Sequence, residues 1–197
     1  MRILLVGAPG SGKGTQAQLL SATTGLAHIS SGDLLREHIA RETAIGRSVK
    51  AFVAAGDLVP DAIVMDMLRK PVVEAADAGG YILDGFPRTV DQAQAAYAIA
   101  KDLGVAVQVA VHLDVPEEEL VRRLLERGRG ADDTEDVIRH RLEVYHRSTE
   151  PMLDYYSDRA ELVTIDGAEP ADDVHAAVLR RVRRVQAAFP DGVEGGN

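Results

Sequence analysis

Residues 7–15 read GAPGSGKGT and follow a short apolar run, Ile3 to Val6. Their spacing matches the phosphate-binding loop G-x-x-x-x-G-K-[ST] as far as Lys13, but Gly14 stands where that pattern has Ser or Thr, and Thr15 comes one position later. Glycines let successive backbone N–H groups point at one anion, and a helix that starts near the lysine adds the positive end of its dipole. The stretch therefore predicts a strand, a phosphate loop and a helix in that order.

The rest of the chain alternates short β-rich runs with helical segments. The β-rich runs are Arg2 to Val6, Ala27 to Ser30, Tyr81 to Asp84, Val105 to Val115 and Leu162 to Asp166. Helical periodicity covers Gly14 to Thr24, Leu34 to Gly56 (two helices broken near Thr43 to Gly46), Asp61 to Ala78, Thr89 to Leu103, Glu117 to Arg127, Thr134 to Tyr156 and Ala171 to Ala188. Strands that are apolar almost throughout predict an α/β fold, a parallel sheet with helices on both faces.

Length and composition limit the kinds of protein that this chain can be. Its 197 residues suit one α/β domain. The chain has no cysteine, which excludes disulfides and thiolate metal sites, and two of its histidines, His140 and His146, are interpreted as surface residues. The formal charge of -9 disfavours nucleic acid and anionic membranes as partners, and no apolar run has the length of a membrane span. We therefore expect a cytoplasmic protein.

A carboxylate ends the apolar run Tyr81 to Asp84. Ligands bind at the carboxyl ends of the strands in sheets of this kind, and an Asp there can hold magnesium directly or through water. The alternative is that Asp84 only caps a strand end before Gly85 and Pro87. The nearby phosphate loop favours the metal interpretation, with Thr15 as a second candidate through water.

Six arginines gather near this strand end and near two irregular segments, residues 30–59 and 126–133. They are Arg36, Arg88, Arg123, Arg127, Arg129 and Arg141. Phosphoryl transfer needs alignment and positive charge around the moving group, and the planar fork of arginine binds phosphate without losing its charge. Each arginine taken alone could be a solvated surface residue, but their clustering in an acidic chain favours a transferase site.

Five stretches together resemble the adenylate kinase family. They are GAPGSGKGTQAQLL (7–20), ISSGDLLR (29–36), GDLVPD (56–61), LDGFPRTVDQA (83–93) and DDTEDVIRHRLEVYHRSTEPMLDYY (132–156). In that family, Gly after the loop lysine is a regular trait. The resemblance implies a three-layer P-loop core with a five-stranded parallel sheet (1–29, 60–125 and 134–197), an AMP-binding flap (30–59) and a short lid (126–133). Since this lid lacks the longer, sometimes zinc-bearing insertion of many bacterial relatives, no structural zinc is expected.

The resemblance also implies an activity and a set of site residues. The activity is reversible transfer of the terminal phosphoryl group of ATP to AMP, which gives two ADP, by a magnesium-dependent enzyme. The ATP side would comprise Gly10, Ser11, Gly12, Lys13, Gly14, Thr15, Arg127 and the backbone at Glu169. The AMP side would comprise Ser31, Arg36, Asp57, Leu58, Val59, Gly85, Phe86, Pro87, Arg88, Gln92, Arg129 and Arg141. The catalytic charges would be Lys13, Arg88, Arg123, Arg129 and Arg141.

Gln92 bears most on the choice of monophosphate. Its amide offers a donor and an acceptor, which can pair with the amino group and a ring nitrogen of adenine. The local alternative is that Thr89-x-x-Gln92 forms a capping box at the start of a helix. Spacing alone does not separate the two, whereas the family resemblance favours AMP over UMP or CMP.

Two other classes of protein also use a phosphate loop. A GTPase-type switch would need Ser or Thr directly after Lys13 and an Asn-Lys-x-Asp motif, and the chain has neither. A non-catalytic nucleotide-binding protein would have no need of a second nucleotide site and a set of lid arginines. We expect a monomeric enzyme whose lid closes over ATP to exclude water, with Gly128 and Gly130 in the lid and Gly46 and Gly56 in the flap as hinge residues.

Overall fold

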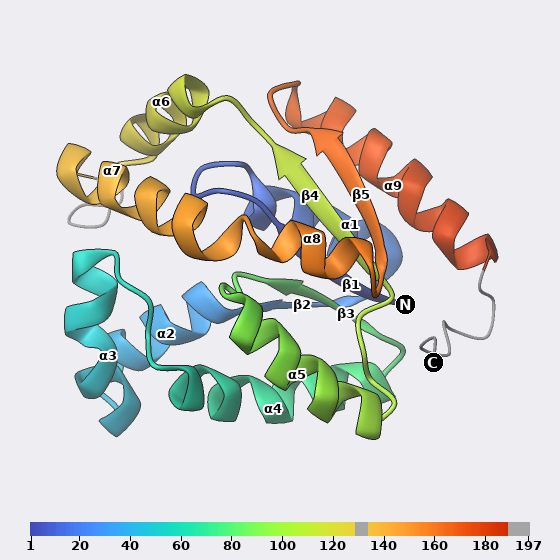
Figure 1. The fold of residues 1–197 in the computed structure, drawn as a ribbon, viewed down its shortest axis with the longest axis horizontal. Coiled ribbons are helices and arrows are strands. Elements are labelled where there is room, and N and C mark those ends of the chain that lie inside the picture. The colour runs from blue at the N-terminus through green and yellow to red at the C-terminus, as the bar shows by residue number, and fades with distance from the viewer. Residues whose placement is uncertain (129–133, 189–197) are drawn as a thin grey trace.

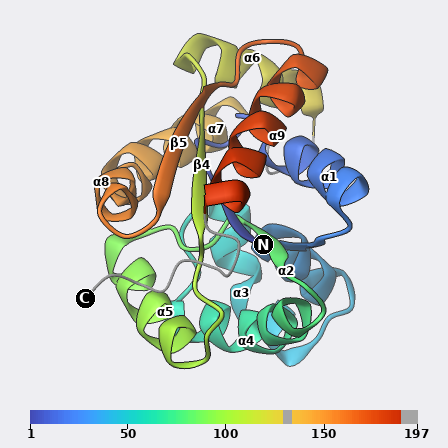
Figure 2. The same ribbon diagram turned by 90° about the vertical axis from the view of Figure 1, so that its right-hand side faces the viewer.

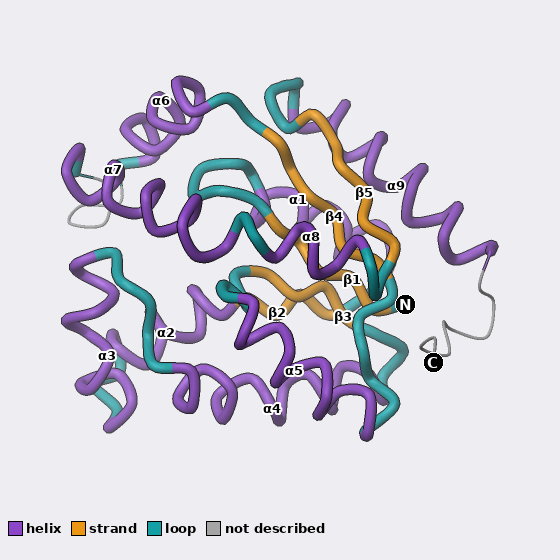
Figure 3. Tube along the Cα trace, in the orientation of Figure 1, coloured by secondary structure: helices purple, strands orange, loops and turns teal. Residues whose placement is uncertain are grey.

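The sheet is the centre of the molecule (Figures 1 and 3). In the computed structural model, which describes residues 1–128 and 134–188, five parallel strands lie in the order β2-β3-β1-β4-β5. Their bounds are β1 (Arg2–Val6), β2 (Ala27–Ser30), β3 (Tyr81–Asp84), β4 (Val109–Asp114) and β5 (Glu161–Asp166). The α/β class and the five-stranded parallel sheet are confirmed.

The predicted strand Val105 to Val115 starts too early. Residues 105–108 form a loop, and β4 begins at Val109. Two backbone groups there find partners outside the strand ladder, although the Gln108 N–H still bonds to the carbonyl oxygen of Arg2 in β1 at 2.9 Å. The Val105 N–H bonds to the carbonyl oxygen of Ala100 at 2.7 Å, and the Arg2 side chain donates to the carbonyl oxygen of Ala106 at 2.6 Å. Apolar side chains alone did not reveal that these groups leave the ladder before Val109.

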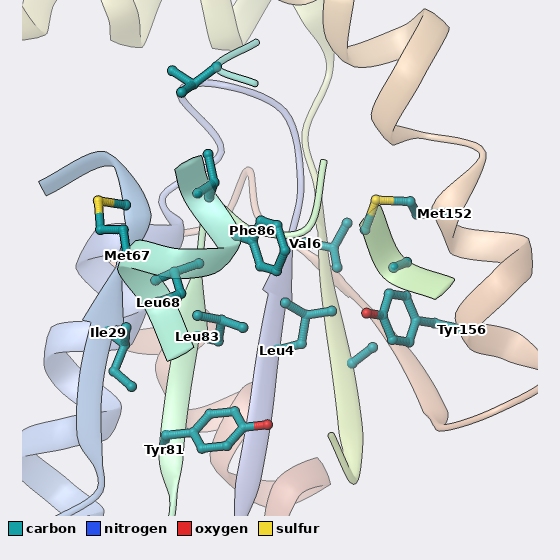
Figure 4. Packing of buried hydrophobic residues seen from close by; sticks show 14 of the residues in the cluster. Leu4, Val6, Ile29, Met67, Leu68, Tyr81, Leu83, Phe86, Met152 and Tyr156 are labelled. Carbon is teal, nitrogen blue, oxygen red and sulfur yellow. The ribbon is translucent and has the colours of Figure 1, made fainter. Parts of the chain in front are cut away.

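Helices cover both faces of the sheet, as the alternation of side chains along β1 requires. Ile3 and Leu5 belong to the core beneath α1 (Lys13–Thr24) and α9 (Ala171–Ala188) (Figure 2). Leu4 and Val6 pack on the opposite face, in the cluster drawn in Figure 4. The helices of that face are α4 (Asp61–Asp77), α5 (Val90–Asp102) and α8 (Met152–Ser157).

The segment 30–59 contains two helices, as predicted: α2 (Ser31–Ala40) and α3 (Ala44–Ala55). The break between them is fixed by Thr43, whose hydroxyl accepts the Gly46 N–H at 3.0 Å and caps α3. A Cβ atom on Gly46 would lie 2.0 Å from the carbonyl oxygen of His38 in α2. Gly46 therefore serves the close packing of the two helices, whereas Gly56, with φ +79°, ends α3.

The long helix predicted from Thr134 to Tyr156 is in fact three pieces. They are α7 (Glu135–Val144), the π-helical turn η2 (Tyr145–Thr149) and α8. Pro151 has no N–H to continue an α-helical ladder, and the Glu150 N–H reaches back five residues to the carbonyl oxygen of Tyr145 at 3.0 Å. The prediction missed this interruption because the helical periodicity continues across it.

The segment 126–133 is only partly described. Helix α6 (Glu117–Arg127) ends at Gly128, and the predicted lid residues Arg129, Gly130, Asp132 and Asp133 lie outside the described residues. Within residues 1–128 and 134–188, no helix is long and apolar enough to cross a membrane.

Candidate active site

A cavity of about 580 Å³ lies where β1 and β3 end and α1 begins. Most of the predicted site residues line it. They are Gly10, Ser11, Gly12, Lys13, Gly14, Thr15, Arg36, Leu58, Asp84, Gly85, Pro87, Arg88, Arg123, Arg127, Arg141 and Glu169. A smaller cavity of about 70 Å³ shares part of this lining and adds Ser31, Asp57, Val59, Phe86 and Gln92. The two predicted nucleotide sites therefore adjoin each other.

The phosphate loop runs from β1 into α1. Gly10 and Gly12 have φ values of +87° and +93°, which turn the chain so that α1 starts at Lys13. No side chain caps this end of α1, so the N–H groups of its first turn remain available to a ligand. A helix N-terminus with free N–H groups at the end of a glycine loop is an anion-binding site.

Lys13 is held over this loop by the backbone. Its Nζ donates to the carbonyl oxygens of Gly7 and Ala8, both at 2.8 Å. Burial lowers the pKa of the Lys13 ammonium to about 8, although the charge of Asp84 acts in the opposite direction. Lys13 is thus a poorly solvated cation whose charge a phosphate would stabilise.

Asp84 ends β3 beside the phosphate loop and is 9% exposed. A Cβ atom on Gly14 would lie 3.8 Å from Asp84 Oδ2, so a side chain after the lysine would point at this carboxylate. On its other side, His28 Nε2 lies 3.9 Å from the same oxygen and has no hydrogen-bond partner among the described residues. One carboxylate next to a phosphate loop fits a magnesium ion that is held mainly by nucleotide phosphates. The described residues contain no group of three or more His, Cys, Asp or Glu that could hold a metal by themselves.

The segment after β3 is organised around Arg88. Its Nε donates to the carbonyl oxygen of Gly85 at 2.8 Å, and its own carbonyl oxygen accepts the Thr149 hydroxyl at 2.8 Å. Burial lowers the pKa of the Arg88 guanidinium, and the nearby Asp84 carboxylate opposes this shift. The π turn of η2 thus supplies a contact that fixes the backbone of an arginine in the cavity wall.

Gln92 makes part of the predicted capping box and also faces the smaller cavity. Its N–H donates to the Thr89 hydroxyl at 3.1 Å, which is the cap of α5. The side chain does not complete the box, because Oε1 accepts the N–H of Arg88 at 2.7 Å and Nε2 donates to Asp61 Oδ1 at 2.6 Å. The cap of α5 is therefore only half of the predicted box, and the Gln92 side chain is held by Arg88 and Asp61 instead.

The remaining arginines approach the cavity from three elements. Arg36 in α2 pairs with Asp33, and Arg127 and Arg141 come from the last turns of α6 and α7. Arg123 pairs with Glu119 at 2.6 Å and donates to the carbonyl oxygens of Gly167 and Ala168 at 2.8 and 3.1 Å. Arg123 thereby contacts the loop that carries Glu169.

The family model for adenylate kinase matches residues 5–161 of this chain. The chain belongs to the adenylate kinase family. Curated relatives named adenylate kinase include those of Rhodococcus erythropolis, 48% identical over 179 residues (91% of this chain and 97% of the relative), and Nocardia farcinica, 47% identical over 184 residues (93% and 100%). Adenylate kinase 1 of a Nostoc species is 44% identical over 173 residues (88% and 94%). The protein is therefore a nucleoside monophosphate kinase, a phosphotransferase.

Sequence reasoning missed three side chains that contact predicted site residues of this adenylate kinase. Asp61 was taken only as part of a helix and His140 as a surface residue, and Thr149 lay within the predicted long helix. In the structure, Asp61 holds Gln92, Thr149 holds Arg88, and His140 Nε2 lies 2.7 Å from Asp57 Oδ1 in the predicted flap. Each of these contacts joins residues more than thirty positions apart, as the separations of 31, 61 and 83 show. The only local signal was the proline of Glu150-Pro151, which interrupts the helix after Thr149.

Proposed function

We propose that this enzyme transfers the terminal phosphoryl group of ATP reversibly to AMP, which gives two ADP. The observation that carries the proposal is the continuity of one cavity from the phosphate loop to Arg36 and Arg88. A donor bound at the loop and an acceptor bound beside these arginines would meet inside that cavity. Family membership supports the same reaction.

The ATP side of the cavity is proposed to bind phosphates mainly through backbone groups. Gly10 to Thr15 would present N–H groups, and Lys13 would exchange its bonds to the loop carbonyls for bonds to the transferring phosphates. Arg127 would contact ATP, and the backbone at Glu169 would meet the adenine. Arg123 already contacts the Gly167–Ala168 backbone beside Glu169, which supports its place on this side.

The AMP side is proposed to depend on side chains as well as backbone. Its members are Ser31, Arg36, the backbone of Asp57 to Val59, Gly85 to Arg88, Gln92 and Arg141, and they line the two adjoining cavities. Arg36 and Arg88 would hold the AMP phosphate, which would compete with Asp33 for Arg36. Gln92 would pair with the adenine edge.

The chemistry needs no covalent enzyme intermediate. An oxygen of the AMP phosphate attacks the γ-phosphorus of ATP as the bond to the leaving ADP oxygen breaks. Lys13, Arg88, Arg123 and Arg141 would neutralise the charge on the transferring group, and Arg129 is proposed to do so from the lid. Mg²⁺ would supply further neutralisation on the ATP phosphates, and Asp84, with Thr15, would hold it through water.

We also propose that residues 30–59 act as the AMP flap and residues 126–133 as the lid, and that the enzyme works as a cytoplasmic monomer. The large apolar side chains that are exposed within the described residues are Phe52 in α3, Leu125 in α6, and Ile99 and Leu103 at the end of α5. The three sites lie on separate helices, which supports a monomer over a dimer that needs one large contiguous patch.

A coupled assay of the purified protein with ATP and each monophosphate tests the proposed acceptor. AMP should be used with a far higher kcat/KM than UMP, CMP or GMP, and product analysis should show two ADP for each AMP consumed. Preference for UMP or CMP would contradict the role of Gln92. Binding of ATP without turnover of any monophosphate would favour a non-catalytic nucleotide-binding protein.

A further inference from the structure

The side chain of Gln92 is 3% exposed, and its amide is held at both ends. Oε1 accepts the backbone N–H of Arg88 at 2.7 Å, and Nε2 donates to Asp61 Oδ1 at 2.6 Å. Asp61 is the first residue of α4, and Gln92 lies in the first turn of α5, the neighbouring helix on the same face of the sheet (Figures 1 and 2). Two elements that are remote in sequence therefore meet at one amide.

The chemistry of these partners permits only one orientation of the amide. A backbone N–H can only donate, so it must face Oε1, and a carboxylate can only accept, so it must face Nε2. Rotating the amide by half a turn would place an N–H₂ group against the Arg88 N–H and an oxygen against the Asp61 carboxylate. Both hydrogen bonds would be lost. Gln92 is buried although Asp61 is exposed, so the unmatched groups of the Gln92 amide would be costly.

This fixed amide keeps one donor and one acceptor for a ligand. A primary amide has two N–H donors and two acceptor lone pairs, and Asp61 and Arg88 each use one. The free acceptor suits the exocyclic amino group of adenine, and the free N–H suits the ring nitrogen N1. Hypoxanthine and guanine present the reverse pattern, a carbonyl oxygen at position 6 and an N1–H donor, which the rotated amide would match.

We propose that Asp61 is a positioning residue that fixes the Gln92 amide and thereby makes the acceptor site select 6-amino purines over 6-oxo purines. The proposal rests on the role of Gln92 given under the proposed function. Asp61 acts through Gln92 and does not contact the substrate. The choice between the two kinds of purine therefore depends on which way the Gln92 amide is oriented, as well as on its presence.

Inosine monophosphate is the sharpest probe, because it differs from AMP only along the edge that Gln92 would read. Asp61→Asn keeps the size of the side chain, but its carboxamide can offer a donor or an acceptor. The rotated Gln92 amide then finds a partner at position 61 and loses only the bond from the Arg88 N–H. The ratio of kcat/KM for AMP to kcat/KM for IMP should fall by about tenfold or more, the equivalent of one to two hydrogen bonds. Turnover at saturating AMP and the KM for ATP should change little.

Asp66→Asn is the matched control, since Asp66 is an exposed residue of the same helix and lies away from Gln92. Its AMP-to-IMP ratio should equal that of the parent enzyme. Thermal unfolding of both variants checks that α4 remains folded, because Asp61 also places a negative charge at the N-terminus of that helix.

Gln92→Leu separates the failure of this proposal from a failure of the proposed function. If Gln92→Leu lowers the AMP-to-IMP ratio and Asp61→Asn does not, Gln92 reads the base but Asp61 does not position it, and the proposal is overturned. If Gln92→Leu leaves the ratio unchanged, Gln92 does not read the base, and both fail. A fall in both single variants, with no further fall in the double variant, supports the proposal.

Discussion

The two ends of the cavity are built in different ways. At the phosphate-loop end, contiguous residues form the site, and Lys13 is held by the carbonyl oxygens of Gly7 and Ala8, six and five positions away. At the proposed AMP end, Gln92 depends on Asp61, and Arg88 depends on Thr149, which lies 61 positions away. The first end is encoded by a motif and the second by tertiary structure, so substitutions should affect them differently.

The largest effect is expected at the centre of the phosphate-loop end. Lys13→Met should lower kcat/KM by about a thousandfold or more, because it removes the cation next to the transferring phosphates. The fold should persist, since the substitution also removes a poorly solvated charge. Steady-state assays and thermal unfolding measure the two effects. Lys70→Met on the exposed surface of α4 is the control, and near-normal turnover of Lys13→Met would exclude Lys13 from the mechanism.

Two glycines of the same loop should respond in opposite ways to alanine. At Gly7, with φ +152°, a Cβ atom would lie 2.8 Å from the carbonyl oxygen of Leu113, so Gly7→Ala should lower the free energy of unfolding by about 2–4 kcal/mol. At Gly14 the nearest atom to a Cβ is Asp84 Oδ2 at 3.8 Å, and the backbone is helical. Gly14→Ala should therefore cost nothing or add up to about 1 kcal/mol. Urea unfolding of the two variants tests this contrast. Equal losses in the free energy of unfolding would show that the loop does not restrict Gly7 more tightly than Gly14.

The same contrast explains how far the sequence could predict the molecule. The phosphate loop, Asp84 and the bounds of α6 and α9 follow from local patterns, and the structure bears out their positions. The break at η2 and the start of β4 depend on where single backbone groups find partners, which apolar periodicity does not record. Asp61, Thr149 and His140 act through contacts across the fold, and the only local signal among them was the proline that follows Glu150, next to Thr149.

The pKa of Lys13 predicts a pH effect confined to the phosphate-loop end. The Lys13 ammonium of the free enzyme is charged below about pH 8 and loses its charge above it. Above about pH 8, kcat/KM for ATP should therefore fall about tenfold per pH unit. Bound phosphates stabilise the ammonium, which raises its pKa, so kcat should hold to higher pH. Rate profiles at constant ionic strength test this. A decline in kcat/KM that starts only near pH of about 10, as for a solvated lysine, would contradict it.

The AMP end should lose less from any single change. Thr149→Val keeps the shape of the side chain but removes the hydroxyl that donates to the carbonyl oxygen of Arg88 at 2.8 Å. We expect a cost of about 1 kcal/mol in stability and a rise of about threefold to tenfold in the KM for AMP, with the KM for ATP unchanged. Thr164→Val, at an exposed position of β5, is the control. An equal rise in both KM values would mean that η2 supports the cavity as a whole.

The smallest effect is expected where the proposed AMP flap contacts α7. His140 Nε2 lies 2.7 Å from Asp57 Oδ1, but their side chains are 40% and 49% exposed, and a pair so open to water contributes little. His140→Ala should raise the KM for AMP by about twofold at most, because it loosens the flap without touching the ligand. His146→Ala is the matched control, since His146 is 45% exposed and pairs with Glu117 and Glu150 instead of the flap. A tenfold effect of His140→Ala alone would mean that this contact limits flap closure, and the AMP end would then depend on a surface contact as strongly as on its buried ones.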